Sequence, residues 1–490
     1  MIKVKEMEIK EKNKIVAGTT LFKSIFAFEG GYSIKIPDYQ RPYVWNAEKV
    51  DTLINDLQYH VEHNSGQIYY MGSILFFCQN GGYEIIDGQQ RLTSLLILDK
   101  IANNGQSILA KHTDKVQFFF NSPISKKNIV EVKNFVNYYK TDWLQNNWNI
   151  VVTDLAFSVI VTNRQDDAFS FFETQNNRGV KLGAADYLKS FHLCELREEE
   201  GKQVAFAKQW DTNNTNQFLN YLFNKVIWRG RSWKGSNVWY ESQDDVLLEF
   251  QRKTRTPEIK NQVQIFPTVK NKIAHAIRYD EYDGILLDTS PIALKSHAIN
   301  YPFSLRQPIE KGIGFFLYSE RYAAMYHFLF NTEHSKNSEL FKFKEFYKAV
   351  YSHSGMSEYL KSLYRLCMVL YYDKFESKDI DKFAKYLDYY IGVYRVELSS
   401  IYDKTAIRIL RDKKQNLLDI ISQAFIPEQV FDFIIENTND TVFRDETIPL
   451  LNENGQLINA VRSNYKRALL KYYEKEDQTS LKALKEWIKL

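Results

Sequence analysis

The chain has 490 residues, enough for two to four domains, and its formal net charge is only +4. This near neutrality argues against a histone-like or tail-driven nucleic-acid binder. The 33 phenylalanines, 32 tyrosines and 8 tryptophans, set against only 20 glycines and 10 prolines, indicate a compact, helix-rich chain with large apolar cores.

The cysteines and the hydropathy pattern exclude further classes of protein. Cys78, Cys194 and Cys367 lie far apart and form no CxxC pair, so neither a Cys-based zinc site nor a disulfide scaffold is expected. The first residues are charged and lack the apolar core of a signal peptide. Because no apolar run is long enough to cross a bilayer, we expect a cytoplasmic protein without a membrane partner.

The predicted elements alternate between strands and helices in the first 200 residues. Residues 1–15 are a polar lead-in. Asn46 is placed to cap a helix whose apolar positions recur at helical spacing from Val50 to Val61. The other elements predicted here are strands at 33–36, 69–77, 83–86 and 156–161, a turn at Gly81-Gly82, and helices after Gly88 and from Ala184.

Beyond residue 200 the pattern becomes mainly helical. Apolar positions at helical spacing predict helices within 339–351, 358–372, 380–396 and 407–424. The polar stretch at 198–201 marks the clearest boundary. We therefore predict an α+β protein, with a mixed α/β domain at 16–198 and a larger mainly helical region at 199–490, which two subdomains could share.

The first motif that could carry chemistry is I-P-D-Y-Q-R-P-Y-V-W at residues 36–45. A strand ends here in a proline-containing turn that presents Gln40 and Arg41 just before a helix. The planar guanidinium of an arginine suits phosphate. The alternative is a structural turn with its aromatic residues in the core.

The second motif, Y-E-I-I-D-G-Q-Q-R-L-T at residues 83–93, predicts a strand, a tight turn and a helix N-terminus. Gly88 permits a sharp turn, and the positive end of the helix favours an anion. Gln89, Gln90 and Arg91 add donors, and Asp87 could hold a metal ion or orient a water. A capped turn with an outward arginine would need only one of these polar residues, so function is the better interpretation.

The third motif runs from Phe172 through Asn176, Arg178 and Gly179 to Asp186 and Lys189. Asp186 and Lys189 share one helix face at i, i+3. An asparagine-rich turn beside one exposed ion pair explains the segment equally well.

Taken together, the three motifs resemble the N-terminal domain of GmrSD-type (type IV) restriction endonucleases, a family related to the ParB/sulfiredoxin-like fold. The resemblance covers roughly residues 16–195, and the motifs occur in the family's order. It implies binding and hydrolysis of nucleoside triphosphates, coupled to restriction of modified, usually phage, DNA. The positions that it marks are Gln40, Arg41, Asp87, Gly88, Gln89, Gln90, Arg91, Asn176, Arg178, Asp186 and Lys189.

Hypothetical roles follow from this resemblance and from the needs of phosphoryl transfer, which are mainly positioning and charge stabilisation. Arg91 would bind phosphate, Gln90 would orient the attacking water, and Asp87 would contact the metal or that water. Mg²⁺ is the expected metal, with Asp87 and Asp186 as its carboxylate ligands. The catalytic group is then Asp87, Gln90 and Arg91, and the other motif residues bind nucleotide.

Many members of this family continue into an HNH-like nuclease half, which requires a histidine general base. No histidine follows residue 353, so no such site is expected in residues 354–490. The nearest look-alike, around His297, lacks a preceding acid. If DNA is cleaved, we expect a separate nuclease subunit to do it.

One segment could contact DNA. Residues 212–240 contain no Asp or Glu and interleave tryptophans with basic residues. Cations can meet phosphates and aromatic faces can stack on bases. The candidate DNA-binding residues are Lys225, Arg229, Arg231, Trp233 and Lys234. The alternative is a loop whose tryptophans anchor it to the helical region.

Two main functions remain open from the sequence, besides a toxin or scaffold that would use this fold without nucleotide. The first is a Mg²⁺-dependent nucleoside triphosphatase within an antiphage restriction system. The second is a non-catalytic module in which nucleotide switches the binding of DNA or protein. Residues that cradle a triphosphate are of the same types in both.

Overall fold

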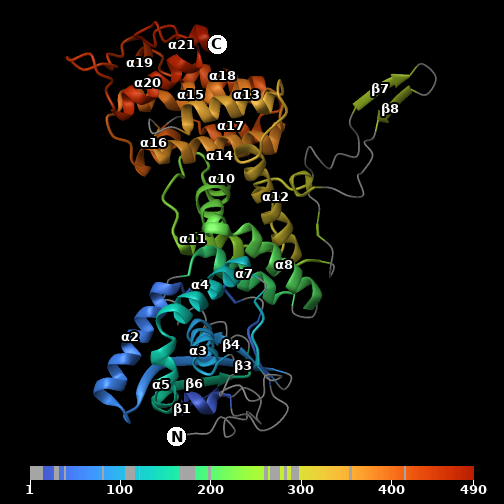
Figure 1. The fold of residues 1–490 in the computed structure, drawn as a ribbon. Helices are drawn as coiled ribbons and strands as arrows, with labels where there is room; N and C mark the ends of the chain where they lie inside the picture. The colour runs from blue at the N-terminus through green and yellow to red at the C-terminus, as the bar shows by residue number, and fades with distance from the viewer. Residues whose placement is uncertain are drawn as a thin grey trace. The chain divides into compact units, whose positions relative to one another are not determined.

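The structure is a computed structural model. It describes residues 15–26, 33–37, 40–79, 82–104, 116–120, 122–164, 167, 171, 182–196, 200–258, 263–264, 276–280, 284–288, 297–352, 356–412 and 415–489. The chain divides into two compact units, residues 1–216 and 217–490 (Figure 1). Within the described ranges, no helix is both long and apolar enough to span a membrane.

The first unit is built on a mixed six-stranded sheet with the order β1-β6-β3-β4-β2-β5. The strand pairs β1/β6 and β3/β4 are antiparallel, whereas β3/β6, β2/β4 and β2/β5 are parallel. The strands are β1 (Ile15–Leu21), β2 (Ser33–Lys35), β3 (Tyr69–Gln79), β4 (Gly82–Asp87), β5 (Val116–Gln117) and β6 (Leu155–Thr162).

Helices pack against one another and against this sheet (Figure 1). They are α1 (Phe22–Ile25), α2 (Ala47–Asn64), α3 (Gln89–Ala102), α4 (Pro123–Tyr139), α5 (Thr141–Asp154), α7 (Ala184–Cys194) and α8 (Glu200–Asn213), followed by the 3₁₀ turn η4 (Thr215–Gln217). The predicted cap of α2 is confirmed, because the Asn46 side chain accepts a hydrogen bond from Lys49 N at 3.1 Å.

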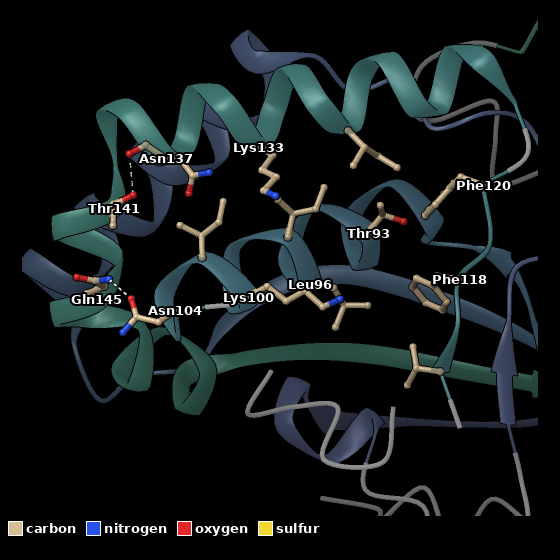
Figure 2. A pocket seen from close by; sticks show the side chains of 14 residues that line it. Thr93, Leu96, Lys100, Asn104, Phe118, Phe120, Lys133, Asn137, Thr141 and Gln145 are labelled. Atoms are coloured by element: carbon tan, nitrogen blue, oxygen red, sulfur yellow. Dashed lines mark hydrogen bonds between the residues drawn. The ribbon is translucent and has the colours of Figure 1, made fainter. Parts of the chain in front are cut away.

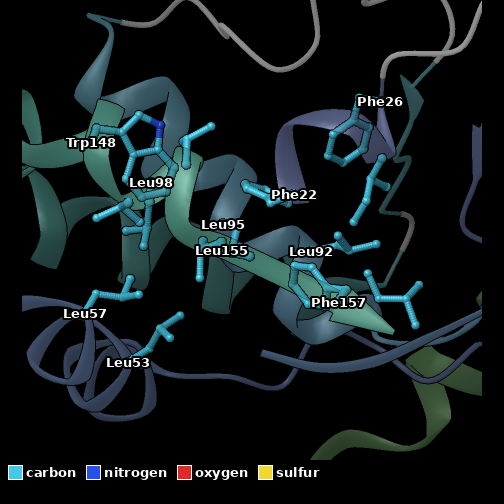
Figure 3. Close-up of a cluster of buried hydrophobic side chains, with 14 of the residues drawn as sticks. Phe22, Phe26, Leu53, Leu57, Leu92, Leu95, Leu98, Trp148, Leu155 and Phe157 are labelled. Atoms are coloured by element: carbon cyan, nitrogen blue, oxygen red, sulfur yellow. The ribbon is translucent and has the colours of Figure 1, made fainter. Parts of the chain in front are cut away.

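The core of the first unit lies between the sheet and these helices. Figure 3 shows Leu92, Leu95 and Leu98 of α3 gathered with Phe22 and Phe157. All five side chains are completely buried. Because α3 buries this apolar stripe, its N-terminus is fixed at the end of β4.

The second unit is mainly helical. Its helices are α9 (Phe218–Tyr221), α10 (Arg229–Ser232), α11 (Gln243–Leu247), α12 (Ile313–Phe330), α13 (Glu339–Phe346), α14 (Glu358–Phe375), α15 (Ile380–Glu397), α16 (Asp403–Arg411), α17 (Leu417–Gln423), α18 (Pro427–Asn437), α19 (Thr441–Arg444), α20 (Val461–Tyr472) and α21 (Leu484–Ile488). The wider π-helical turns are η5 (Leu222–Trp228), η6 (Leu248–Arg252) and η8 (Tyr347–Tyr351); η7 (Ala298–Asn300) is a 3₁₀ turn, and β7 (Ala276–Asp280) pairs with β8 (Gly284–Asp288).

The predicted fold class is confirmed: a mixed sheet with helices precedes a mainly helical region. One helical segment differs from its prediction, because the stretch at 407–424 contains two helices: α16 ends at Arg411 and α17 begins at Leu417. The Asn416 side chain caps α17 by accepting from Leu418 N at 2.9 Å, and this local bond starts a new helix. Of the predicted turn at 81–82, Gly81 lies outside the described residues.

Candidate functional site

The turn between β4 and α3 requires glycine. Gly88 has φ +96°, and a Cβ there would lie 3.0 Å from Ile74 Cγ1. The first hydrogen bond of α3 runs from Leu92 N to Gly88 O at 2.9 Å. The three preceding amides, at residues 89–91, therefore stand at the positive end of the helix, directly after Asp87, as an anion site requires.

Two glutamines join the first motif to the second. Gln40 Nε2 donates to Ile85 O at 3.0 Å and to Ile86 O at 2.7 Å. Gln90 Oε1 accepts from Val44 N at 2.8 Å, while its Nε2 donates to Pro42 O at 3.1 Å. Both side chains are buried. The glutamines therefore hold residues 40–44 against β4 and α3, and that is how Arg41 reaches the turn.

Arg91 makes three hydrogen bonds inside the protein. Its guanidinium donates to Met71 O at 3.0 Å, to Ser73 O at 2.7 Å and to Asp87 Oδ2 at 3.2 Å. Gly72 lies between the two carbonyl groups with φ +101°, and a Cβ there would collide with Arg91 Nη1. Arg91 thus supports an irregularity in β3 and orients the Asp87 carboxylate.

The charges of two carboxylates, Asp186 and Asp87, act on the Arg41 guanidinium. Burial lowers the pKa of the Arg41 guanidinium, and the negative charges of Asp186 and Asp87 oppose that shift. The pKa of Asp186 is raised by burial, against the hydrogen bond from Gly183 and the charge of Arg41. Gly183 N donates to Asp186 Oδ2 at 3.0 Å, so this carboxylate also caps the start of α7.

Lys189 is a buried cation, 2 % exposed, and not the exposed member of a surface pair. Its Nζ donates to Asp211 Oδ1 at 2.9 Å and to Gln40 O at 3.3 Å. Burial raises the pKa of Asp211, and the charge of Lys189 opposes it. Asp211 was not predicted from the sequence, since it lies on α8, beyond the three motifs and without a motif of its own.

Gln89 differs from Gln90, the other glutamine of the motif, because one of its buried polar atoms lacks a hydrogen-bond partner. The residue is 4 % exposed, and its Oε1 has no hydrogen-bond partner in the described part of the chain. A buried amide without a partner costs free energy, about 1–3 kcal/mol. A ligand or water at the turn would remove that cost.

The two predicted magnesium ligands, Asp87 and Asp186, differ in how far their oxygens are already engaged. Asp87 keeps 22 % of its side chain exposed and uses one oxygen for Arg91, so it can offer its other oxygen to a cation. Asp186 already accepts the Gly183 amide. Over the described ranges, no group of three or more His, Cys, Asp or Glu could hold a metal by itself. Asp87 fits an ion that is held mostly by phosphate oxygens and water.

The remaining motif residues, Asn176 and Arg178, lie outside the described residues. The structure thus brings together Gln40, Arg41, Asp87, Gly88, Gln89, Gln90, Arg91, Asp186 and Lys189, and adds Asp211.

The positive charges of the arginines in the acid-free stretch 212–240 are paired with acids from other segments of the second unit. Arg229 is 1 % exposed, bonds Glu241 at 2.9 Å and Asp403 at 3.2 Å, and lies 4.6 Å from the Trp233 ring centroid. Trp233 is fully buried and donates through Nε1 to Trp239 O.

Arg231 bonds Glu249 at 2.7 Å and two main-chain carbonyls. Burial therefore commits Arg229, Arg231 and Trp233 to internal packing. Lys225 pairs with Glu241 and is 35 % exposed, and Lys234 is exposed. A DNA contact by this segment stays a prediction that these two lysines could carry.

Two family models match the chain. Residues 20–193, which contain the β4–α3 turn and the cluster around Arg41 and Asp186, match the GmrSD restriction endonuclease N-terminal domain, and this confirms the resemblance. Residues 202–448, half of the chain, match a family of unknown function (DUF7834), so the chain belongs to that family. Neither model is that of an HNH nuclease, and no curated protein matches the chain.

Proposed function

We propose that the first unit binds a nucleoside triphosphate with Mg²⁺ at the turn between β4 and α3 and hydrolyses it. The protein would act as one component of a type IV restriction-related defence system on modified DNA, with cleavage supplied by a separate nuclease subunit. The observation that carries the proposal is that Arg41 feels the charges of both Asp87 and Asp186, with Asp87 directly before the N-terminus of α3, within a GmrSD N-terminal domain.

A triphosphate fits the charge distribution of this turn. The N-terminal amides of α3 and the Arg41 guanidinium offer positive charge, and the Gly88 turn lets a phosphate approach the backbone closely. The buried Gln89 amide, whose oxygen has no partner, adds a group that a ligand hydroxyl or bound water would satisfy.

Asp87 is the residue that we assign to the metal ion or the attacking water. Mg²⁺ would neutralise charge that develops on the phosphates. Because Arg91 and Gln90 are held by main-chain contacts, we assign them to positioning: Arg91 orients Asp87, and Gln90 holds the segment that carries Arg41. Lys189 and Asp211 would support Gln40 from the other side.

The non-catalytic switch remains the second candidate, and a specific observation favours it. The two side chains expected to bind phosphate and orient water, Arg91 and Gln90, already have protein partners. A nucleotide could therefore bind at this turn, rearrange residues 40–44 and alter the binding of DNA or protein without turnover.

Phosphate release distinguishes the two candidates. It would be measured with ATP, GTP, CTP and UTP in the presence of Mg²⁺, with and without DNA, for the native chain and for Asp87→Asn. We expect Asp87→Asn to lose about 100-fold in turnover while a nucleotide still raises its melting temperature. Glu84→Gln, on the same strand but paired with Lys35 at 3.1 Å, is the matched control and should keep full turnover.

Two other outcomes of these measurements would contradict the hydrolysis proposal. A nucleotide-induced rise in melting temperature without phosphate release from any of the four would leave the switch. If millimolar nucleotide changed neither quantity in a folded protein, both proposals would be wrong, and a scaffold that uses this fold without nucleotide would be the better interpretation.

A further inference from the structure

A hollow in the first unit lies along α3, and neither Arg41 nor Asp87 lines it. It has a volume of about 660 Å³ and is lined by residues of α3, α4, the start of α5 and the segment after β5 (Figure 2). That volume lies within the range of small-molecule sites, roughly 300–1,000 Å³. The proposed triphosphate site does not account for it.

The apolar surface of this hollow is only half covered. Leu96 and Ile97 of α3, Ile129 of α4 and Phe118 and Phe120 beyond β5 line it, and each remains partly exposed while packing on the core. Five large apolar side chains facing one cavity are unusual for a surface that binds nothing. They would contact the apolar body of a ligand.

Two lysines supply the charge. Lys100 on α3 and Lys133 on α4 extend into the same space from opposite walls (Figure 2). Both side chains are exposed, and neither forms an ion pair with a described residue. No described acid lines the hollow, so its electrostatic preference is for an anion.

The buried end of the hollow contains a polar atom without a hydrogen-bond partner. Thr93 is 3 % exposed, lines the hollow, and its Oγ1 has no hydrogen-bond partner in the described part of the chain. Gln89 lies one turn before Thr93 on the same helix and has the second such atom on α3. At the other end, Gln145 donates to Asn104 at 2.9 Å and bounds the hollow.

We propose that this hollow binds a small amphipathic organic anion. Its carboxylate or phosphate would pair with Lys100 and Lys133, its aromatic or aliphatic body would lie on Leu96, Ile97 and Phe118, and a polar group of the ligand would meet Thr93. Lys100 lies roughly 16 Å along α3 from Gln89, so the anionic end is separate from the triphosphate turn. The inference does not depend on the proposed nucleotide function.

Two fluorescent probes that differ in one charged group test this proposal. 8-Anilinonaphthalene-1-sulfonate is an aromatic anion, and N-phenyl-1-naphthylamine has the same rings without the sulfonate. Both would be titrated into the full chain. We expect both to bind saturably, and we expect Lys100→Gln with Lys133→Gln to weaken the sulfonate about tenfold and the neutral probe less than twofold.

Matched variants separate the hollow from general charge and from misfolding. Lys126→Gln with Lys127→Gln removes the same charge from exposed positions of α4 that do not line the hollow, and it should leave both titrations unchanged. Ile97→Trp fills the space and should abolish saturable binding of both probes. Far-ultraviolet circular dichroism and the melting temperature show that each variant is folded.

Competition experiments distinguish a carboxylate ligand from a phosphate ligand. Octanoate is an aliphatic carboxylate and phenyl phosphate an aromatic phosphate; displacement of the sulfonate probe by either supports the proposal and names the class. The proposal is overturned if the pocket lysine pair affects both probes equally, if Ile97→Trp leaves binding intact, or if neither competitor displaces the probe.

Discussion

The β4–α3 turn of the first unit and the arginines of the acid-free stretch, which lie in the second unit, both contain prominent cations, but their charges are used differently. Around the turn, Arg41 lies near Asp87 and Asp186, and a glycine turn opens a helix N-terminus beside them. In 212–240, Arg229 and Arg231 are enclosed by Glu241, Asp403 and Glu249. An acid-free run in the sequence therefore does not make a basic surface, since the neutralising acids come from other elements.

The largest expected effect tests whether Arg229 serves packing. Arg229→Met removes a buried cation and leaves Glu241 and Asp403 with the partly exposed Lys225 as their remaining described partner, so we expect the free energy of unfolding to fall by about 4 kcal/mol. Urea denaturation measures this change. Lys234→Met, an exposed position in the same stretch, should change stability by less than about 0.5 kcal/mol. Equal effects of the two variants would remove the distinction between buried and exposed cations.

The corresponding experiment in the first unit concerns Lys189. Lys189→Met leaves the Asp211 carboxylate buried without its partner, and we expect a loss of about 3 kcal/mol. The double variant Lys189→Met with Asp211→Leu should recover most of that loss, because no charge is then left in the interior. A double-mutant cycle by urea denaturation gives the coupling; additive losses would mean that the pair does not interact.

A third test uses Asp388, a buried carboxyl of the second unit. Asp388 is 1 % exposed and accepts hydrogen bonds from Tyr351 at 2.8 Å and Tyr465 at 3.1 Å. Burial raises its pKa to about 7, and the two tyrosine hydroxyls oppose the shift. Because the pKa is higher in the folded than in the unfolded chain, this group stabilises the fold below about pH 4, and that contribution declines as the pH rises toward 7.

Asp388→Asn carries no such charge and should lack this decline. The stability of the native chain relative to Asp388→Asn should therefore fall by about 2 kcal/mol between pH 5 and pH 7. Urea denaturation of both proteins at several pH values measures it. A constant difference across that range would show that the carboxyl does not titrate there.

The smallest expected effect concerns the turn itself. Gly88→Ala places a Cβ near Ile74 in a left-handed backbone conformation, and we expect a loss of about 1 kcal/mol together with weaker nucleotide binding. Gly66→Ala, also at positive φ but with open space around it, is the control for backbone strain alone. If both variants lost equal stability and kept nucleotide binding, the approach of a phosphate to the Gly88 backbone would not contribute to nucleotide binding.

Local patterns predicted strands β2, β3, β4 and β6 and helices α2, α3 and α7 of the first unit. The cap at Asn46, the stripe from Val50 to Leu57 and the turn at Gly88 were readable because each depends on residues close in sequence. Strands β1 and β5 were missed, and so were helices α1, α4, α5 and α8. β5 has only two residues, and β1 is recognisable chiefly by its pairing with β6.

The candidate site was predictable as a set of residues but not as a set of contacts. Asp87, Gly88 and Arg41 were found from motifs. The engagement of Arg91 with Met71 and Ser73, and of Gln90 with Pro42 and Val44, links segments separated in sequence, and no spacing rule reveals such bonds.

The sequence by itself determined the fold class, the order of the motifs and the position of the turn, because helix periodicity, capping and glycine conformation are short-range properties. Only the tertiary structure decided which charges are buried and which acids neutralise them. Asp211 reaches Lys189 from α8, and Asp403 reaches Arg229 across 174 positions. The energy of a charge depends on its distance from other charges and from water, and folding sets both.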